Sequence, residues 1–586
     1  MTFTGIAASP GIGVGPVVRF EPEEIAVRET RIPPERVEPE IERLRAALTD
    51  ARRDLLSIRD RIAAELGEPE AAIYDAHLLI LDDPELKRSV EETIRAERRA
   101  AAGVFRDYMS RVAAFLEKIE DDHLREKRAD VLDVERRVLR LLLGGGPQWL
   151  DTLKQPAVLV CHELAPSDAA LLDRRRVLGF VTEVGSRTSH FAIVARGRGI
   201  PAVVSARGVM QHVRTGDLGA VDGFLGTFEL NPDEAEQARY RAGVERVERQ
   251  ERELLLLRDQ PAVTTDGHVL ELGANIELPG EAEAVMASGA DSVGLFRTEF
   301  FYLNRFELPT EDEQYRAYRG VVEMLAPRPV IFRTMDLGGD KVASYLGMTH
   351  ETNPFMGWRG IRFALQHPEV FRTQLRAIYR ASAHGRVRMM FPMVSTETEL
   401  LHTLQLCSEV RAQLDAFGQP YDRELAPGIM IETPSAVWMA DVLARHASFF
   451  SIGSNDLTQY TLAMDRDNER LAHLYDPLEP AVLRSIQHTI DAARGAGRWV
   501  GVCGEMAGDP LVAVLLLGMG VDELSMSTFD LPRVKAAIRA VHHADARKIA
   551  VRVLGCASAA AVKRMLRDGI EPKLPAFLRT REGDGE

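Results

Sequence analysis

A histidine at the expected start of a helix is the side chain of this sequence best suited to carry a reactive group. His190 follows Thr188 and Ser189, two residue types that often cap helices, and the apolar run from Phe191 onward is typical of a first helical turn. Free backbone N–H groups and the helix dipole attract anions at such an end, and Arg187 adds a cation. Because a phosphoryl group adds about two negative charges, these surroundings favour a phosphohistidine.

Two other interpretations of His190 must be weighed. A histidine after a Ser/Thr pair is often only a surface residue at a helix start. A Ser-His hydrolase would also use these residue types, but the adjacent Ser189 and His190 would rarely face each other, and the sequence shows no third member of a triad. The C-terminal half of the chain decides between these interpretations.

Polar side chains follow a series of short apolar runs in that half. They are Arg297, Arg333, Glu432, Asn455, Asp456 and Cys503, with Arg466 shortly after the sixth run. Arginines can bind a phosphate and a carboxylate through paired N–H groups. Glu432 and Asp456 are oxygen ligands of the kind that Mg²⁺ prefers. Asn455 could donate an amide N–H to a phosphate, and Cys503 could protonate a carbanion.

Each of these residues also has a structural explanation when taken alone. Arg297 and Glu299 could form a structural ion pair, and Cys503 could be a small buried hydrophobe. Asp336 and Asp340 could be turn residues. Their joint placement at strand ends is what favours chemistry.

The apolar runs themselves predict the fold that would position these groups. There are eight, separated by longer helical segments: His268–Ile276, Ser292–Phe296, Val330–Thr334, Val387–Val394, Gly428–Ile431, Phe449–Ile452, Trp499–Cys503 and Asp522–Met526. Eight strand–helix units predict a (β/α)8 TIM-type barrel, whose catalytic groups sit at the C-terminal ends of the strands. Thr433 and Pro434, just after the fifth run, are expected to cap and begin a helix.

The whole chain is therefore expected to be a multidomain α/β protein. Residues 1–34 and 144–230 form a small α/β domain that carries His190, interrupted by a helical insertion over residues 35–143. A charged helical linker covers residues 231–261, the barrel residues 262–575, and a short tail residues 576–586. The linker and residues near 145–150 would be hinges that let the α/β domain swivel as a body.

Composition narrows the class of protein. The chain has 586 residues, a net charge of -15 with both signs interspersed, and four scattered cysteines. The charge argues against a nucleic-acid-binding surface, and the cysteines against a disulfide framework. The sequence begins without a signal-peptide pattern, and its longest apolar stretch, Leu511–Val521, is too short to span a bilayer. We expect a cytoplasmic protein without membrane insertion.

The motifs together resemble those of Enzyme I of the bacterial sugar phosphotransferase system, the phosphoenolpyruvate–protein phosphotransferase family. GSRTSHFAIVAR resembles its phosphorylated-histidine motif, and GLFRTEFFY, FRTMDLGGDK, MIETPSA, SIGSNDLTQY and GVCGEMAGD resemble its substrate-site motifs. The resemblance implies that His190 carries the phosphoryl group on Nε2 and that Cys503 donates the proton that yields pyruvate. It implies that Arg297, Arg333, Asn455, Asp456 and Arg466 bind phosphoenolpyruvate, and that Glu432 and Asp456 hold Mg²⁺.

The same resemblance implies two partners. The helical insertion would dock the small carrier protein HPr through the segment IYDAHLLILDDPEL, with His77, Leu79, Ile80, Asp83 and Glu85 as contacts. The acidic residues there suit a positively charged partner. A homodimer through the barrel is the other implied assembly.

Three positions depart from the family pattern. Ser186 stands where the family often has glycine, and Ala169 where it has a threonine that could hydrogen-bond the histidine. Leu132 stands where an arginine is common. These departures put in question the resting orientation of His190 and details of HPr docking.

Two rival functions remain open. Pyruvate phosphate dikinase and phosphoenolpyruvate synthase share a phosphohistidine domain and a barrel, but they carry a large nucleotide-binding domain, and no Walker loop occurs here. A non-catalytic regulatory module would use the barrel to sense phosphoenolpyruvate and the helices to bind a partner.

Overall fold

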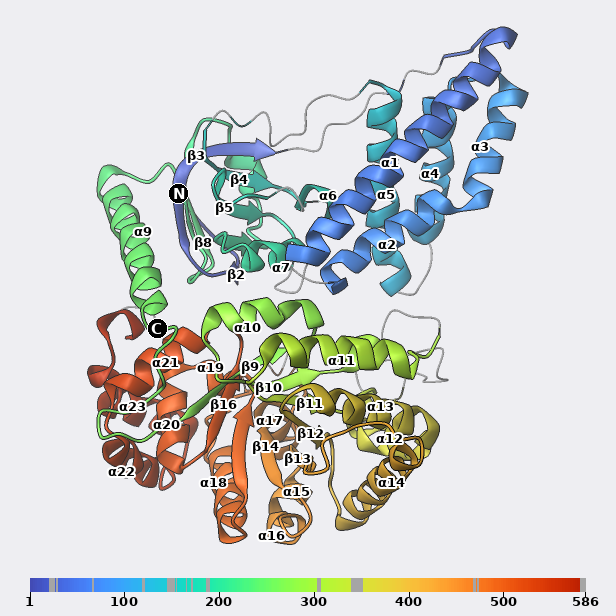
Figure 1. Cartoon of the computed structure of the whole chain (residues 1–586). Helices are drawn as coiled ribbons and strands as arrows, with labels where there is room; N and C mark the ends of the chain where they lie inside the picture. Colours follow the sequence, from blue (N-terminus) through green and yellow to red (C-terminus); the bar gives the residue numbers. More distant parts are fainter. Residues whose placement is uncertain are drawn as a thin grey trace. The chain divides into compact units, whose positions relative to one another are not determined.

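The computed structural model divides the protein into two compact units, Met1–Gln250 and Glu251–Glu586. The residues that it describes are 1–20, 27, 30–65, 68–117, 122–144, 153, 155–164, 166–169, 172–185, 190–302, 307–338, 351, 353–466, 471 and 474–579. Figure 1 shows the elements of both units along the chain.

The first unit contains a mixed sheet with the strand order β1-β8-β7-β3-β4-β5-β6-β2. Its strands are β1 (Thr2–Thr4), β2 (Ile6–Ser9), β3 (Ile12–Phe20), β4 (Ala157–Cys161), β5 (Val177–Thr182), β6 (Ala202–Val204), β7 (Leu218–Asp222) and β8 (Thr227–Leu230). The run β3-β4-β5-β6 is parallel, and β4 is buried at every position, as its continuous apolar sequence leads one to expect. The N-terminal strands thus join the sheet, as the sequence predicts.

Short helices lie between the later strands of this sheet: α6 (Pro166–Ala169), α7 (His190–Gly197) and α8 (Val209–His212). Within the described residues, α7 runs from His190, so a helix is present where the sequence predicts one. Phe191 and Ala192 anchor α7 in an apolar cluster that also contains Ala169. The positions Ser186, Arg187, Thr188 and Ser189 lie outside the described residues.

The predicted helical insertion is a bundle of five helices, α1 (Val37–Glu65), α2 (Glu68–Asp82), α3 (Pro84–Glu97), α4 (Ala101–Glu117) and α5 (Asp122–Leu142). These helices bury a core of their own, in which Tyr74 and Phe105 are among the largest fully buried side chains. Asp83 caps α3 by accepting a hydrogen bond from the backbone N–H of Glu85. The charged connector is the helix α9 (Glu234–Leu255), and the division between the two units falls within it.

The second unit is built on a closed barrel of eight parallel strands. They are β9 (Glu271–Ile276), β10 (Ser292–Arg297), β11 (Val330–Arg333), β12 (Val387–Phe391), β13 (Gly428–Ile431), β14 (Phe449–Gly453), β15 (Trp499–Cys503) and β16 (Glu523–Met526). Each of the eight predicted runs overlaps one of these strands, so the barrel prediction is confirmed. β16 closes the barrel against β9.

Helices surround this barrel and share one large apolar core with its strands (Figure 1). They are α10 (Ala282–Ser288), α11 (Glu311–Leu325), α12 (Ile361–Gln366), α13 (Pro368–Ala381), α14 (Glu397–Ala416), α15 (Pro434–Trp438), α16 (Ala440–Leu443), α17 (Ser454–Leu462), α18 (Pro480–Gly495), α19 (Glu505–Gly508), α20 (Pro510–Met519), α21 (Leu531–Ala540), α22 (His543–Val553) and α23 (Ala559–Gly569). Among the helices of the described residues, none combines the length and the apolar content that a membrane crossing requires.

Candidate active site

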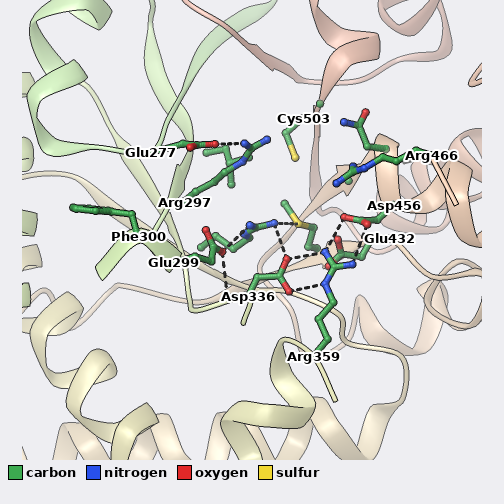
Figure 2. Close-up of a pocket in the computed structure, with 16 residues that line it drawn as sticks. Glu277, Arg297, Glu299, Phe300, Asp336, Arg359, Glu432, Asp456, Arg466 and Cys503 are labelled. Atoms are coloured by element: carbon green, nitrogen blue, oxygen red, sulfur yellow. Dashed lines mark hydrogen bonds and ion pairs between the residues drawn. The ribbon is translucent and has the colours of Figure 1, made fainter. Parts of the chain in front are cut away.

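A pocket of about 250 Å³ opens at the C-terminal ends of the barrel strands. Its lining includes all seven barrel residues singled out in the sequence: Arg297, Arg333, Glu432, Asn455, Asp456, Arg466 and Cys503. It also includes Glu277, Glu299, Asp336 and Arg359, whose part in the site the sequence analysis did not predict. Figure 2 shows these charged side chains converging from several strands.

Arg333 ends β11 and lies buried at the base of the pocket. Its Nη2 donates to Oε1 of Glu299 at 2.6 Å, and its Nη1 lies 3.2 Å from Oδ2 of Asp336. Burial opposes the charge of the guanidinium, but the two carboxylates outweigh it and raise the pKa of Arg333. Glu299 therefore pairs with Arg333, and Arg297 pairs with Glu277. The structural explanation offered for the sequence, an ion pair between Arg297 and Glu299, is wrong.

Arg359 joins two acidic groups of the pocket. Its Nε and Nη2 donate to the carboxylate of Asp336 at 3.0 and 2.9 Å, and its Nη1 and Nη2 donate to that of Asp456, both at 3.1 Å. Burial disfavours the cation, yet Asp336 and Asp456 raise the pKa of Arg359 well above its usual value. Asp336 is thus a member of this buried network and holds both arginines, Arg333 and Arg359.

Glu432 is the carboxylate of the pocket that is least compensated. It follows β13 directly, and Thr433 then caps α15 by accepting from the N–H of Ala436 at 3.2 Å, as predicted. Oε1 of Glu432 accepts from the N–H of Met393 at 2.5 Å, but Oε2 has no hydrogen-bond partner within the described part of the chain. Burial, reinforced by Asp456 and Asp336, raises the pKa of Glu432 to about 8.

The carboxylates fit a divalent cation that is shared with a substrate. Burial, together with the neighbouring carboxylates, disfavours the ionised form of Glu432, and a cation beside it would favour that form; Oε2 is also a buried oxygen in need of a partner. Mg²⁺ is typically held by one or two carboxylates together with water and substrate phosphate. Within the described residues, no group of three or more acidic, histidine or cysteine side chains is arranged to hold a metal ion.

Cys503 ends β15 and faces the pocket from an apolar wall that includes Leu295 and Met430. Its Sγ accepts from Oγ of Ser451 at 3.4 Å and donates to the carbonyl oxygen of Ile452 at 3.6 Å. Burial raises the pKa of this thiol to about 11. The sulfur therefore keeps its proton at neutral pH and has one to give.

The remaining polar residues lie toward the mouth of the pocket. The side-chain oxygen of Asn455 accepts from the N–H of Glu505 at 3.2 Å, which leaves its NH₂ group as the end that can donate to a ligand. Arg466 is half-buried and, with Arg359, favours the charged form of Asp456, whose pKa is lowered although burial opposes this. The pocket thus combines several cations, oxygen ligands and a thiol.

The candidate docking residues lie on α2 and at the start of α3. Leu79 and Ile80 border a groove of about 520 Å³, together with Asp82, Asp83, Pro84, Leu86, Tyr108, Met109, Val112 and Val131. The side chain of Leu79 is 67% exposed, and Glu85 is exposed beside it. His77, in contrast, is fully buried, with its Nε2 3.4 Å from Oδ1 of Asp130 on α5. A partner in the groove would not reach it in this arrangement.

Of the three positions that depart from the family pattern, Ser186 lies outside the described residues, and Ala169 and Leu132 lie within them. Ala169 is fully buried at the end of α6, and Leu132 packs half-buried against the core of the helical bundle. The side chain of His190 lies outside the described part of the structure.

Comparison with known proteins gives matches along nearly the whole chain. Three family models match: "PEP-utilising enzyme, N-terminal" over residues 4–127, "PEP-utilising enzyme, mobile domain" over 153–226, and "PEP-utilising enzyme, PEP-binding domain" over 251–543. The phosphoenolpyruvate-protein phosphotransferase of Geobacillus stearothermophilus is 42% identical over 558 residues, which cover 95% of this chain and 96% of the relative. That of Haemophilus influenzae is 40% identical over 565 residues, covering 96% and 98%.

A solved structure is also similar to part of the chain. The solution structure titled Enzyme I (nEIt) is 36% identical and matches with a TM-score of 0.36. The match covers 42% of this chain and 99% of that one.

Proposed function

Because this chain belongs to the phosphoenolpyruvate-protein phosphotransferase family, we propose that it moves a phosphoryl group from phosphoenolpyruvate to His190. From His190 the group passes to a histidine of the carrier protein HPr, and pyruvate is released. The reaction is the first step of the sugar phosphotransferase relay. The observation that carries this proposal is the convergence of Arg297, Arg333 and Arg466 with several carboxylates and a thiol in one pocket.

The arginines supply the positive charge that a phosphoenolpyruvate trianion needs. Arg297, Arg333 and Arg466 neutralise its phosphate and carboxylate, and Asn455 donates an amide N–H to the phosphate. In the transfer step the bond between phosphorus and the enol oxygen breaks, and a bond to Nε2 of His190 forms. The electron pair stays on the enolate, whose charge the same fixed cations stabilise.

A Mg²⁺ ion would be held by Glu432 and Asp456, in keeping with the unpartnered Oε2 of Glu432. When bound, such an ion neutralises charge on the phosphoryl group and on the enolate oxygen. Arg359 fixes the carboxylate of Asp456 through its paired N–H groups. It is therefore a positioning residue for this site.

Cys503 completes the chemistry by protonating carbon. The enolate takes the proton of the thiol at its CH₂ carbon, which gives the methyl group of pyruvate and leaves a thiolate. The hydroxyl of Ser451 donates to that sulfur and can stabilise the charge until water returns a proton. Because the enolate becomes the more stable keto form of pyruvate, the transfer of the phosphoryl group to the histidine is favourable.

The N-terminal unit would perform the second half of the relay. We assign residues 1–34 and 144–230 to the phosphohistidine domain, 35–143 to the HPr-binding domain, 231–261 to the linker, 262–575 to the barrel and 576–586 to a tail. The phosphohistidine domain swivels between the barrel pocket and HPr. A homodimer through the barrel, as the family resemblance implies, is the proposed assembly.

HPr would dock in the groove beside Leu79, where Asp83 and Glu85 supply negative charge. Consistent with an acidic surrounding, burial and these two carboxylates raise the pKa of Tyr108 in the groove. Leu79→Arg places a cation in an apolar contact and should raise the KM for HPr at least about tenfold. Phosphorylation of His190 by phosphoenolpyruvate should be unchanged, and Leu401→Arg, on the exposed face of α14, is the matched control.

The central experiment is incubation of the full chain with labelled phosphoenolpyruvate and Mg²⁺, followed by mapping of acid-labile phosphate. The label is expected on His190 and should be absent from His190→Ala. Label from ATP in place of phosphoenolpyruvate would favour a dikinase instead. Phosphoenolpyruvate binding without pyruvate release would favour a regulatory module.

A further inference from the structure

The rim of the pocket holds an ion pair to which the proposed mechanism gives no role. Glu277 is the first residue after β9, and its side chain lines the pocket beside Arg297, the last residue of β10. Nη1 of Arg297 donates to Oε1 of Glu277. Figure 2 shows this pair at one edge of the pocket, apart from the network that joins Asp336 and Arg359.

The loop that carries Glu277 is well anchored. The backbone N–H groups of Glu277 and Leu278 donate to Oε2 of Glu281 at 2.7 and 2.8 Å. This carboxylate fixes the chain just after the strand, so the side chain of Glu277 starts from a fixed point at the rim. The contact with Arg297 is therefore a feature of the barrel mouth, made by two neighbouring strands.

The pair differs from the other arginine contacts of the pocket in its exposure. Its side chains are 35% exposed in Arg297 and 58% exposed in Glu277. Those of Arg333 and its partner Glu299 are only 6% and 3% exposed. A buried pair leaves an uncompensated charge when it is broken, whereas a solvent-exposed pair contributes little and exchanges readily. Arg297 can thus change partners more easily than Arg333.

We propose that Glu277 is a positioning residue that occupies Arg297 while the pocket is empty and yields it to an entering phosphate dianion. The inference rests on the proposed function, because it takes phosphoenolpyruvate to be the ligand of this pocket. A phosphate offers two charges and several acceptor oxygens, so it competes well for the guanidinium. After the phosphoryl group has left, Glu277 takes Arg297 back, which weakens the hold on a ligand that lacks phosphate.

Removal of this internal competitor should therefore tighten substrate binding. In Glu277→Gln a neutral amide replaces the carboxylate. The charge of Arg297 is then not neutralised by this side chain, and the incoming anion is not repelled by it. Exposed ion pairs have a small free energy, which corresponds to an affinity gain of about two- to fivefold for phosphoenolpyruvate. Salt screens such exposed charges, so the gain should shrink as ionic strength rises.

The test measures phosphoenolpyruvate binding to the full chain by calorimetry, with Mg²⁺ present and with His190→Ala introduced to prevent turnover. Glu277→Gln should lower the Kd about two- to fivefold at low salt, and much less in 0.5 M salt. The matched control is Glu283→Gln, which removes the same charge from the exposed face of nearby α10 without touching Arg297. Its Kd should stay that of the parent.

Steady-state rates with native His190 give a second readout that a merely structural role would not move. KM for phosphoenolpyruvate should fall in Glu277→Gln while kcat changes less than about twofold. An unchanged or higher Kd in Glu277→Gln, or an equal fall in Glu283→Gln, overturns the inference and leaves the proposed function intact. Failure of the His190→Ala parent to bind phosphoenolpyruvate overturns the ligand assignment itself, and the role of Glu277 with it.

Discussion

The thiol of Cys503 is placed to act as an acid, and its protonation state follows from its burial. With a pKa near 11, the group remains a thiol across the range from pH 6 to 9, so its ionisation should not limit activity there. Cys503→Ser replaces it with a hydroxyl that is a much weaker acid. Turnover should fall by at least about 100-fold, the usual contribution of a positioned general acid, while phosphoenolpyruvate affinity changes little.

Stopped-flow or coupled pyruvate assays would measure this loss, and calorimetry would measure the affinity. Cys407→Ser is the control, because Cys407 is an equally buried thiol on α14 that does not line the pocket. If Cys503→Ser released pyruvate at the parental rate, another group would have to protonate the enolate.

A substitution of Arg359 would show whether the carboxylates of the pocket need the geometry of a guanidinium or only its positive charge. Its guanidinium bridges Asp336 and Asp456 with paired N–H groups, which the single ammonium of a lysine cannot reproduce. Arg359→Lys should lower kcat/KM at least about tenfold and the unfolding free energy by about 1–3 kcal/mol, because buried carboxylate oxygens lose partners. Arg362→Lys, in the same segment, serves as control: among the residues that the structure describes, Arg362 donates only to two backbone carbonyls.

The loss in Arg359→Lys is measured by steady-state kinetics and by denaturant unfolding. Equal losses in the two variants would mean that Arg359 merely supports its segment.

Most pocket residues at strand ends could be identified from the sequence, although Glu277 was missed, whereas Arg359, which a loop holds, could not be identified. Arg297, Arg333, Glu432 and Cys503 directly end or follow apolar runs, so the barrel rule alone brings them together. Arg359 precedes the short helix α12 and follows no strand, so only its fold places it between two carboxylates. The pairing of Glu299 with Arg333 likewise depends on the fold, because Glu299 follows β10 and Arg333 ends the neighbouring strand β11.

At the scale of elements, strand and helix periods predicted the architecture, but side-chain burial on a helix depended on its neighbours. The eight apolar runs and the five-helix segment correspond to observed elements. His77 and Leu79 are two residues apart on α2, yet one is fully buried and the other is 67% exposed. The burial of His77 follows from the position of α5 against α2, which no local pattern in α2 encodes.

The barrel strands also bury a second acidic group, at the end opposite the pocket. Glu523 begins β16, is 1% exposed and accepts from Oγ of Ser292 at 2.9 Å. Burial and the nearby Glu271 raise its pKa to about 8, with Arg388 opposing and Asp291 adding to the shift. The folded barrel thus holds a proton that the unfolded chain releases above its ordinary pKa of 4.5.

The sign of the resulting pH dependence follows from this raised pKa. The stability that the protonated Glu523 contributes is complete below pH 4.5 and is lost as pH rises through 8. Glu523→Gln keeps the shape and a hydrogen-bonding amide without a titrating group. Its Tm at pH 8.5 should exceed the parent by at least about 2 °C, with a flatter profile between pH 6 and 8.5.

Calorimetric melts of the full chain over this range would measure the effect, and the exposed Glu424→Gln is the control. A Glu523→Gln profile with the parental slope would show that this carboxylate is already ionised in the fold.

At the scale of the whole molecule, the proposed relay requires one histidine to serve two sites, and α9 would be the tether between the two units. The chain forms two compact units that meet within α9 at Gln250. A covalent connection holds one unit near the other, and a short flexible linker would give an effective concentration of about the millimolar level. In the proposed relay, phosphorylation of His190 by the barrel would then be effectively unimolecular.

Cutting the chain after Gln250 should convert this step into a bimolecular one. With the separate units at about 1–10 μM, phosphorylation of His190 by phosphoenolpyruvate should slow by about 10²–10³-fold and should increase in proportion to added barrel unit. Exchange between His190 and HPr should keep its rate, because the N-terminal unit contains both the histidine and the groove beside Leu79. Rapid-quench measurement of phosphohistidine distinguishes the two steps. A severed pair that is as fast as the intact chain at 1 μM would mean that the units associate tightly on their own, and that the tether is dispensable.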